Sequence, residues 1–195
     1  AQSVCGYRSL DVTNPIEFLG NKILYEGKEI ELGEKTFFID GQLSDEVTAR
    51  YPFVFNSFNK AAKAFVAGTE AEPMKVYIAP YVYWIDNPDD PQVRVGKDGK
   101  EPFGLVVKCP YLHLVGLTKN PENVVLASSR GQTQGAVGNF TMFDFWGDGL
   151  SVKNLTMGNY CNVDLEFPLK KELGRKKRMS AITQAHVAYC HGDKI

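Results

Sequence analysis

From residue 75 onward, the chain consists mostly of short apolar runs separated by turn-forming residues. The runs are rich in Val, Ile, Leu, Phe or Tyr and are bounded by Gly, Asn, Asp or Pro, which is typical of strands joined by turns. They predict strands at 75–79, 104–109, 112–117, 123–127, 140–145, 150–157 and 186–190. No comparable helical pattern lies between these runs, so we predict a mainly β fold.

The first part of the chain has a different pattern, with two short strands and one helix. Alternating apolar residues predict strands at 22–25 and 35–39, and the second closes on an Asp40-Gly41 turn. From residue 57 apolar residues recur at helical spacing, where Ser57 can cap the start of a helix and Gly68 can end it. We therefore predict one short N-terminal helix.

Many short strands can close as an antiparallel sandwich or wind as a parallel solenoid, and periodicity alone does not distinguish the two. Hairpin signals of the Asn-Gly type are scarce, which favours a β-helix, in which each strand pairs with the next turn of the coil. Only residues 191–195 follow the last predicted strand. Because a solenoid needs a cap over its last coil, we expect the chain to be truncated at its C-terminal end or to need a partner there.

Composition and charge narrow the possible partners. The 195 residues contain 22 basic and 23 acidic side chains, and the net charge of -1 gives no general attraction to nucleic acid or an anionic membrane. No apolar run approaches the roughly 18 residues that cross a bilayer. At 44% hydrophobic residues, the chain can bury one core, so we expect one domain or a piece of a larger one.

Cysteine and histidine spacing gives no sign of a metal or cofactor. The four cysteines are Cys5, Cys109, Cys161 and Cys190, and they contain no CxxC pair. Their spacing does not determine a disulfide pairing, and we favour buried thiols over disulfide bridges. The three histidines lack HExxH spacing, and no GxSxG motif is present: His113, His186 and His191. We expect these histidines to be structural or exposed.

Four ordered stretches resemble the pectin methylesterase (pectinesterase) family. They are residues 37–41 followed by the helix at 57–67, residues 76–83, residues 112–159 with Gly147-Asp148-Gly149, and Gln184-Ala185 with Gly192-Asp193. The second stretch departs from the family's Pro-Gly-x-Tyr-x-Glu motif, because Tyr81 stands where Gly is usual and Ile85 where Glu is usual. Glycine suits the Gly-Asp-Gly turn because it adopts a positive φ without a Cβ clash.

This resemblance implies a right-handed parallel β-helix at 37–195, with 1–36 as an N-terminal extension. It implies a secreted, periplasmic or cell-surface esterase that hydrolyses galacturonate methyl esters in pectin without a cofactor. Gln184 falls on a family motif and would stabilise the oxyanion as an uncharged donor. The family's catalytic Asp and Arg motifs would follow residue 195, so we expect this chain alone to be inactive.

Aromatic residues are the candidates for sugar contact, because rings pack against the apolar faces of sugars. We select Trp84 and Trp146 as substrate-binding candidates. The basic run at 170–178 is interpreted as a solvated loop. Two alternatives stay open, namely a non-catalytic polysaccharide-binding β-helix and a β-helix pectate lyase or glycoside hydrolase. The lyase would use acidic residues clustered around calcium, and no such cluster stands out.

Overall fold

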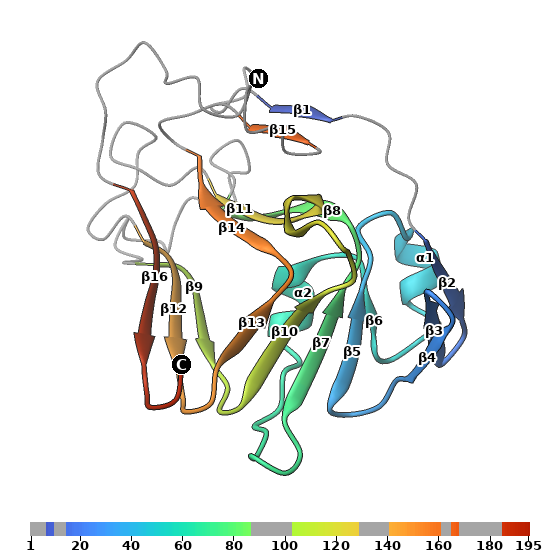
Figure 1. Ribbon diagram of the computed structural model, residues 1–195, viewed down its shortest axis with the longest axis horizontal. Helices are drawn as coiled ribbons and strands as arrows, with labels where there is room; N and C mark the ends of the chain where they lie inside the picture. Colours follow the sequence, from blue (N-terminus) through green and yellow to red (C-terminus); the bar gives the residue numbers. More distant parts are fainter. Residues whose placement is uncertain (1–6, 10–14, 87–102, 129–140, 161–164, 168–184) are drawn as a thin grey trace.

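A computed structural model describes residues 7–9, 15–86, 103–128, 141–160, 165–167 and 185–195 (Figure 1). The protein is mainly β, as predicted. None of the helices in these residues is long and apolar enough to span a bilayer.

The largest sheet has five strands, and all its pairings are parallel. In spatial order it contains β13 (Ser151–Lys153), β10 (Leu112–Gly116), β7 (Met74–Ile78), β5 (Thr36–Ile39) and β6 (Val54–Phe55). Strands β7 and β10 alternate buried and more exposed positions, so one of their faces turns inward and the other outward.

Two further parallel sheets have three strands each. One contains β14 (Thr156–Asn159), β11 (Val124–Ser128) and β8 (Tyr81–Asp86). The other contains β16 (His186–His191), β12 (Thr141–Trp146) and β9 (Phe103–Lys108). In both, the middle strand pairs with neighbours that are distant in sequence, as expected from the scarcity of hairpin signals.

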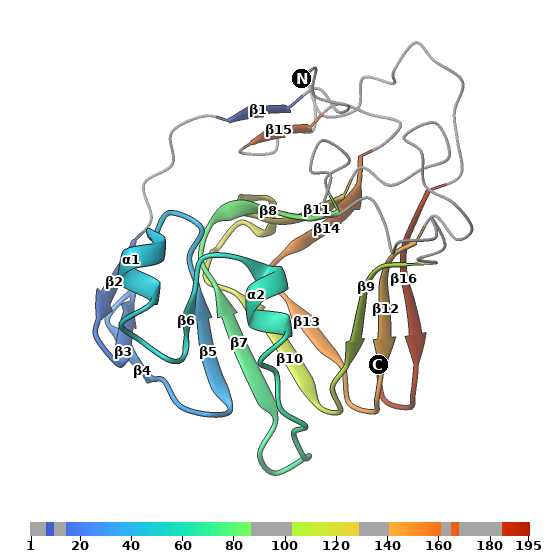
Figure 2. The same cartoon turned by 180° about the vertical axis from the view of Figure 1, so that it is seen from behind.

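The order of strands repeats between the three parallel sheets. Strands β7, β8 and β9 follow one another along the chain, and each lies in a different sheet. Strands β10, β11 and β12 repeat this order and pair with them in parallel. Strands β13, β14 and β16 then pair with β10, β11 and β12 (Figures 1 and 2).

The main hydrophobic core receives side chains from all three parallel sheets. Its fully buried members include Val76 from β7, Leu126 from β11 and Phe143 from β12. The short helix α2 (Phe58–Ala62) adds Phe58, whose ring meets that of Phe143 edge-on at a centroid distance of 5.8 Å. The core therefore joins the three sheets and α2 into one packed unit.

A separate antiparallel sheet lies at the N-terminal side of the protein, at the right of Figure 1. It contains β2 (Ile16–Leu19), β3 (Lys22–Tyr25) and β4 (Lys28–Glu31). Its Ile23 and Phe18 pack in a second cluster with Phe38 of β5, and the two Phe rings lie 6.0 Å apart. This cluster fixes the antiparallel sheet against β5.

Three short elements complete the described structure. Helix α1 (Asp45–Thr48) is capped by the Ser44 side chain, and the 3-10 helix η1 (Pro121–Asn123) is capped by Asn120. Strands β1 (Tyr7–Ser9) and β15 (Leu165–Phe167) pair in parallel. The prediction of a single helix was therefore incomplete, because α1 was missed.

The predicted helix begins as expected but ends early. The Ser57 hydroxyl accepts a hydrogen bond from the Lys60 backbone N–H, which confirms the cap, yet the helix stops at Ala62 and not at Gly68. Beyond it, Phe65 packs near the ring of Phe37, at 6.1 Å between centroids. Packing against the core therefore takes precedence over continuation of the helix.

The predicted strand at 150–157 is divided into β13 and β14. Asn154 between them adopts a φ of +54°, a left-handed conformation that ends an extended strand. The positive φ predicted for the Gly-Asp-Gly turn is confirmed at Gly147, with +126°, and at Gly149, with +72°. Strand β8 was not recognised as a separate strand, and Pro80 marks the corner before it.

Candidate functional site

Two rings lie stacked on neighbouring strands at one edge of the β9-β12-β16 sheet. Trp146 of β12 and His191 of β16 are direct partners in the parallel register. Their ring centroids are 3.9 Å apart and the planes differ by 11°. Trp146 is 45% exposed and the His191 side chain 42% exposed. The two rings therefore form a stack that is partly exposed to solvent.

A buried carboxylate holds both rings. Asp144 lies two residues before Trp146 on the same strand, so the two side chains point to the same face. Its Oδ2 accepts a hydrogen bond from Trp146 Nε1 at 2.7 Å, and its Oδ1 lies 2.8 Å from His191 Nε2. Asp144 is only 3% exposed. We name Trp146, His191 and Asp144 the ring platform.

The carboxylate also determines how the imidazole is protonated. An ionised carboxylate only accepts hydrogen bonds, so Nε2 of His191 must donate and carry a proton. In the neutral ring, Nδ1 is then the acceptor. A fixed tautomer and a fixed ring plane are what a preorganised binding surface needs.

The positions around the ring platform are apolar or cationic. On the same face, Val106 and Tyr189 are the strand partners of Asp144, and both are exposed. Lys108 is the partner of Trp146 on the other side, away from His191. The surface thus combines rings, an aliphatic group and an ammonium, a composition suited to a sugar that carries hydroxyl or carboxyl groups.

The thiol next to the ring platform in sequence is that of Cys190. Cys190 is adjacent to His191 in sequence, and successive strand residues point to opposite faces. Burial, with a smaller contribution from the Asp144 charge, raises the pKa of the Cys190 thiol and disfavours the thiolate. The Cys190 thiol is therefore poorly suited to act as a nucleophile here.

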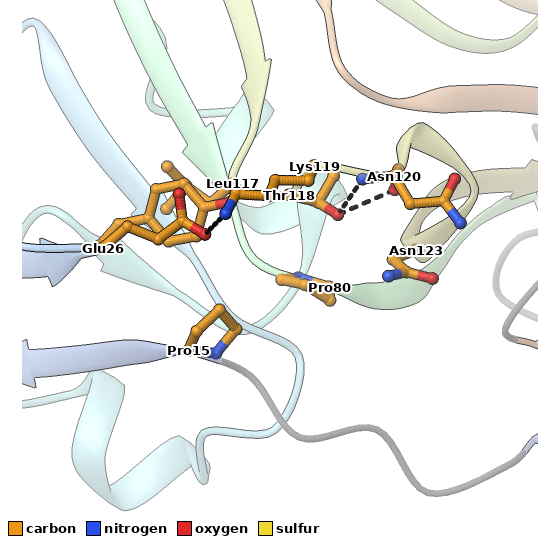
Figure 3. A pocket seen from close by; sticks show the side chains of 9 residues that line it. Pro15, Glu26, Pro80, Leu117, Thr118, Lys119, Asn120 and Asn123 are labelled. Atoms are coloured by element: carbon orange, nitrogen blue, oxygen red, sulfur yellow. Dashed lines mark hydrogen bonds and ion pairs between the residues drawn. The ribbon is translucent and has the colours of Figure 1, made fainter.

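The described structure also contains a hollow of about 210 Å³ between the antiparallel sheet and the chain after β10 (Figure 3). Its charges are paired, with Lys119 Nζ 2.9 Å from Glu26 Oε1. The Thr118 hydroxyl bonds to the backbone of Asn120. Because these groups satisfy one another and Leu117 and Pro80 form apolar walls, we interpret the hollow as a structural junction.

The residues selected from the sequence have different positions. Gln184 lies outside the described residues. Trp84 of β8 is half-buried and packs against the cluster that contains Val82 and Val125, on a different sheet from Trp146. Trp146 is the one of the two selected tryptophans that lies on the ring platform.

Sequence reasoning missed the partnership of Asp144 with His191. The two residues are 47 positions apart, and only the parallel pairing of β12 with β16 brings them together. His191 is exposed, as expected, and among the described residues no group of histidine, cysteine and carboxylate side chains is arranged to hold a metal ion. Of the described cysteines, Cys109 is buried, as favoured, whereas Cys190 is exposed, and both are free.

Comparisons of the chain with protein-family models, with curated proteins and with solved structures found no match.

Proposed function

We propose that the three parallel sheets are the faces of one right-handed parallel β-helix of the pectinesterase type, and that its ring platform binds pectin. Three coils support the β-helix, namely β7-β8-β9, β10-β11-β12 and β13-β14-β16, because each strand pairs with its counterpart in the next coil. The right-handed sense follows from the strong preference of parallel crossovers for that hand.

The observation that carries the binding function is the partly exposed stack of Trp146 and His191, whose nearly parallel rings are both bonded to buried Asp144. A sugar ring has an apolar C–H face that packs on an aromatic plane. Because Asp144 already fixes both rings, little side-chain freedom is lost when a sugar binds. The hydroxyl and carboxyl groups of the sugar would extend past the rings toward Lys108 and the solvent.

Pectin is the proposed polysaccharide because the ordered motifs resemble those of pectinesterases. Gly147 and Gly149, which have a positive φ, lie in the turn of the Gly-Asp-Gly motif in that resemblance. Since pectin is a cell-wall polymer, the protein would act outside the cell. Ester hydrolysis is the second candidate, and the match of Gln184 to the family's oxyanion-binding glutamine favours it.

Binding is tested by titration calorimetry with esterified pectin, comparing wild type with W146A and W84A. Aromatic contacts contribute about 0.5–1.5 kcal/mol, so W146A should weaken binding by up to about tenfold. W84A serves as the matched control, because Trp84 packs in a cluster on another sheet. Equal affinity of W146A and wild type, with both folded by circular dichroism, would refute the ring platform as the binding site.

Hydrolysis is tested separately by methanol release from esterified pectin. In an active esterase that contains this chain, Gln184→Ala should lower the rate of methanol release by about 10² or more, because one oxyanion donor is removed. Binding without methanol release would leave the polysaccharide-binding β-helix and exclude the esterase for this polypeptide.

A further inference from the structure

A row of basic side chains crosses the outward face of the five-stranded sheet. Lys75 of β7 and His113 of β10 are direct partners in the parallel register, and Ser151 of β13 continues the row. Lys153 lies two residues beyond Ser151 on the same strand and face. The alternate residues of β7 and β10, such as Val76 and Leu114, are buried in the core. The basic row therefore faces away from the core.

Lys75 and Lys153 differ from several other lysines of the protein. In the part of the chain that the structure describes, neither Lys75 nor Lys153 has an ion-pair partner, although both are exposed. Other lysines do have carboxylate partners: Lys22, Lys35, Lys60, Lys119 and Lys194. Lys75 and Lys153 therefore carry positive charge that no carboxylate of the described residues neutralises. This local charge exists although the chain as a whole has a net charge of only -1.

His113 is affected by both lysines. Burial lowers the pKa of its imidazole, and the charges of Lys153 and Lys75 lower it further. The two ammonium groups thus lie close enough to His113 to disfavour a third positive charge. An anion placed between the lysines would relieve this repulsion.

We propose that Lys75, His113 and Lys153, which we name the cationic strip, bind the carboxylate groups of an acidic polysaccharide. The strip differs from the ring platform because it lies on another sheet and acts through charge. Ser151 adds a hydroxyl that can donate to a carboxylate. Lys75 and His113 lie on adjacent strands, about 4.8 Å apart, and Lys153 lies two residues beyond the partner of His113 on β13. The strip therefore offers two ammonium groups and an imidazole on one face to an extended polymer.

The support beneath the strip is rigid. Tyr77 and Val115, the next residues on the outward face, are register partners, and Tyr77 packs against the cluster that joins the antiparallel sheet to β5. Because the backbone is fixed by parallel pairing on both sides of β10, binding would order only the lysine side chains.

The choice of a polyuronate rests on the proposed function, since pectin without its methyl esters is a chain of galacturonate. The ring platform would accept the esterified chain through stacking, whereas the cationic strip would accept the de-esterified chain. This predicts that the protein distinguishes the two forms by different surfaces.

The test compares Lys75→Glu/Lys153→Glu with the control Lys28→Glu/Lys63→Glu, which changes exposed lysines outside the strip and gives the same net charge. Dissociation constants are measured for polygalacturonate and for fully esterified pectin. At about 0.01 M salt, where the Debye length is about 30 Å, the strip variant should bind polygalacturonate at least about tenfold more weakly than the control. Binding of esterified pectin should be the same for both.

Several outcomes would overturn the cationic strip. These are equal polygalacturonate affinity of the two charge-reversal variants, no weakening of wild type at high salt, or equally tight binding of single-stranded nucleic acid. If Lys75→Glu/Lys153→Glu does not fold by circular dichroism, Lys75→Gln/Lys153→Gln replaces it and should weaken binding about threefold or more. Failure of wild type to bind esterified pectin would instead refute the proposed function, because that ligand tests the ring platform.

Discussion

Replacement of Asp144 by alanine tests whether the buried carboxylate holds the ring platform together. The change removes the acceptor of both Trp146 Nε1 and His191 Nε2. A hydrogen bond contributes about 1 kcal/mol net, and one to a charged group about 1.5–3 kcal/mol. Loss of the two hydrogen bonds together would therefore lower the free energy of unfolding by about 3 kcal/mol or more.

Two effects reduce this figure. Both donor rings are partly exposed, so after truncation their N–H groups can bond to water and do not remain unsatisfied. The substitution also removes a charge that was 3% exposed, and with it the cost of burying that charge. We therefore expect Asp144→Ala to lower the free energy of unfolding by about 1–2 kcal/mol.

Asp144→Asn is the matched control, because it keeps the size of the side chain. Its amide oxygen can accept from Trp146, and its NH₂ group can donate to His191 Nε2 if the imidazole proton moves to Nδ1. Both hydrogen bonds would then survive, so this variant should stay within about 0.5 kcal/mol of wild type at neutral pH.

Urea denaturation measured by tryptophan emission provides the assay. A Trp84→Phe background leaves Trp146 as the single tryptophan, since the chain has two. The emission of folded Asp144→Ala should also change, because the indole would lose its fixed partner. If Asp144→Ala has the same unfolding free energy and emission as the background protein, the carboxylate does not hold the rings and the reasoning fails.

Three further predictions concern pH dependence, reactivity and the core. Because folding lowers the pKa of His113, the unfolded chain binds the proton more readily, and the free energy of unfolding should fall as pH drops through about 6.5. In urea denaturation at several pH values, His113→Gln should make the free energy of unfolding depend less on pH. An unchanged pH dependence in this variant would contradict the prediction. Burial raises the pKa of Cys109 to about 11, so iodoacetamide at pH 8 should label exposed Cys190 well before buried Cys109. Peptide mapping measures the labelling of each cysteine, and equal labelling rates in the native protein would be inconsistent with this prediction. In urea denaturation, Phe58→Ala should lower the free energy of unfolding by about 3–5 kcal/mol, because Phe58 is buried. Val66→Ala, at an exposed position, should lower it by less than about 1 kcal/mol. A similar decrease for both variants would argue against the packing of α2 on the core.

The strands were the part of the fold that the sequence predicted best. The run at 75–79 corresponds to β7 and the run at 112–117 to β10, because β-branched and apolar residues alternate there between turn formers. Boundaries that depend on a single backbone angle were missed, as at Asn154. The length of α2 could not be predicted either, because the packing of Phe65 against the core ends the helical turn sooner than its own spacing implies.

The candidate site was predicted only in part. Trp146 could be selected because aromatic rings pack against the apolar faces of sugars. Its partner His191 could not, since nothing local links two residues that are 45 positions apart by number and joined only through strand pairing. Asp144 was hidden for a different reason: a single acidic residue within an apolar strand does not show which groups it will bond.

The parallel register has a consequence for how the surfaces of this protein can change during evolution. Along a row such as Lys75 and His113, each strand supplies a single outward side chain, while its neighbours in sequence face the core. A substitution in the row therefore changes one step of the surface and leaves the packed interior intact. In these strands, outward positions determine ligand recognition and the inward positions between them determine stability. Ligand preference can therefore change by substitution of single outward residues while the fold is retained.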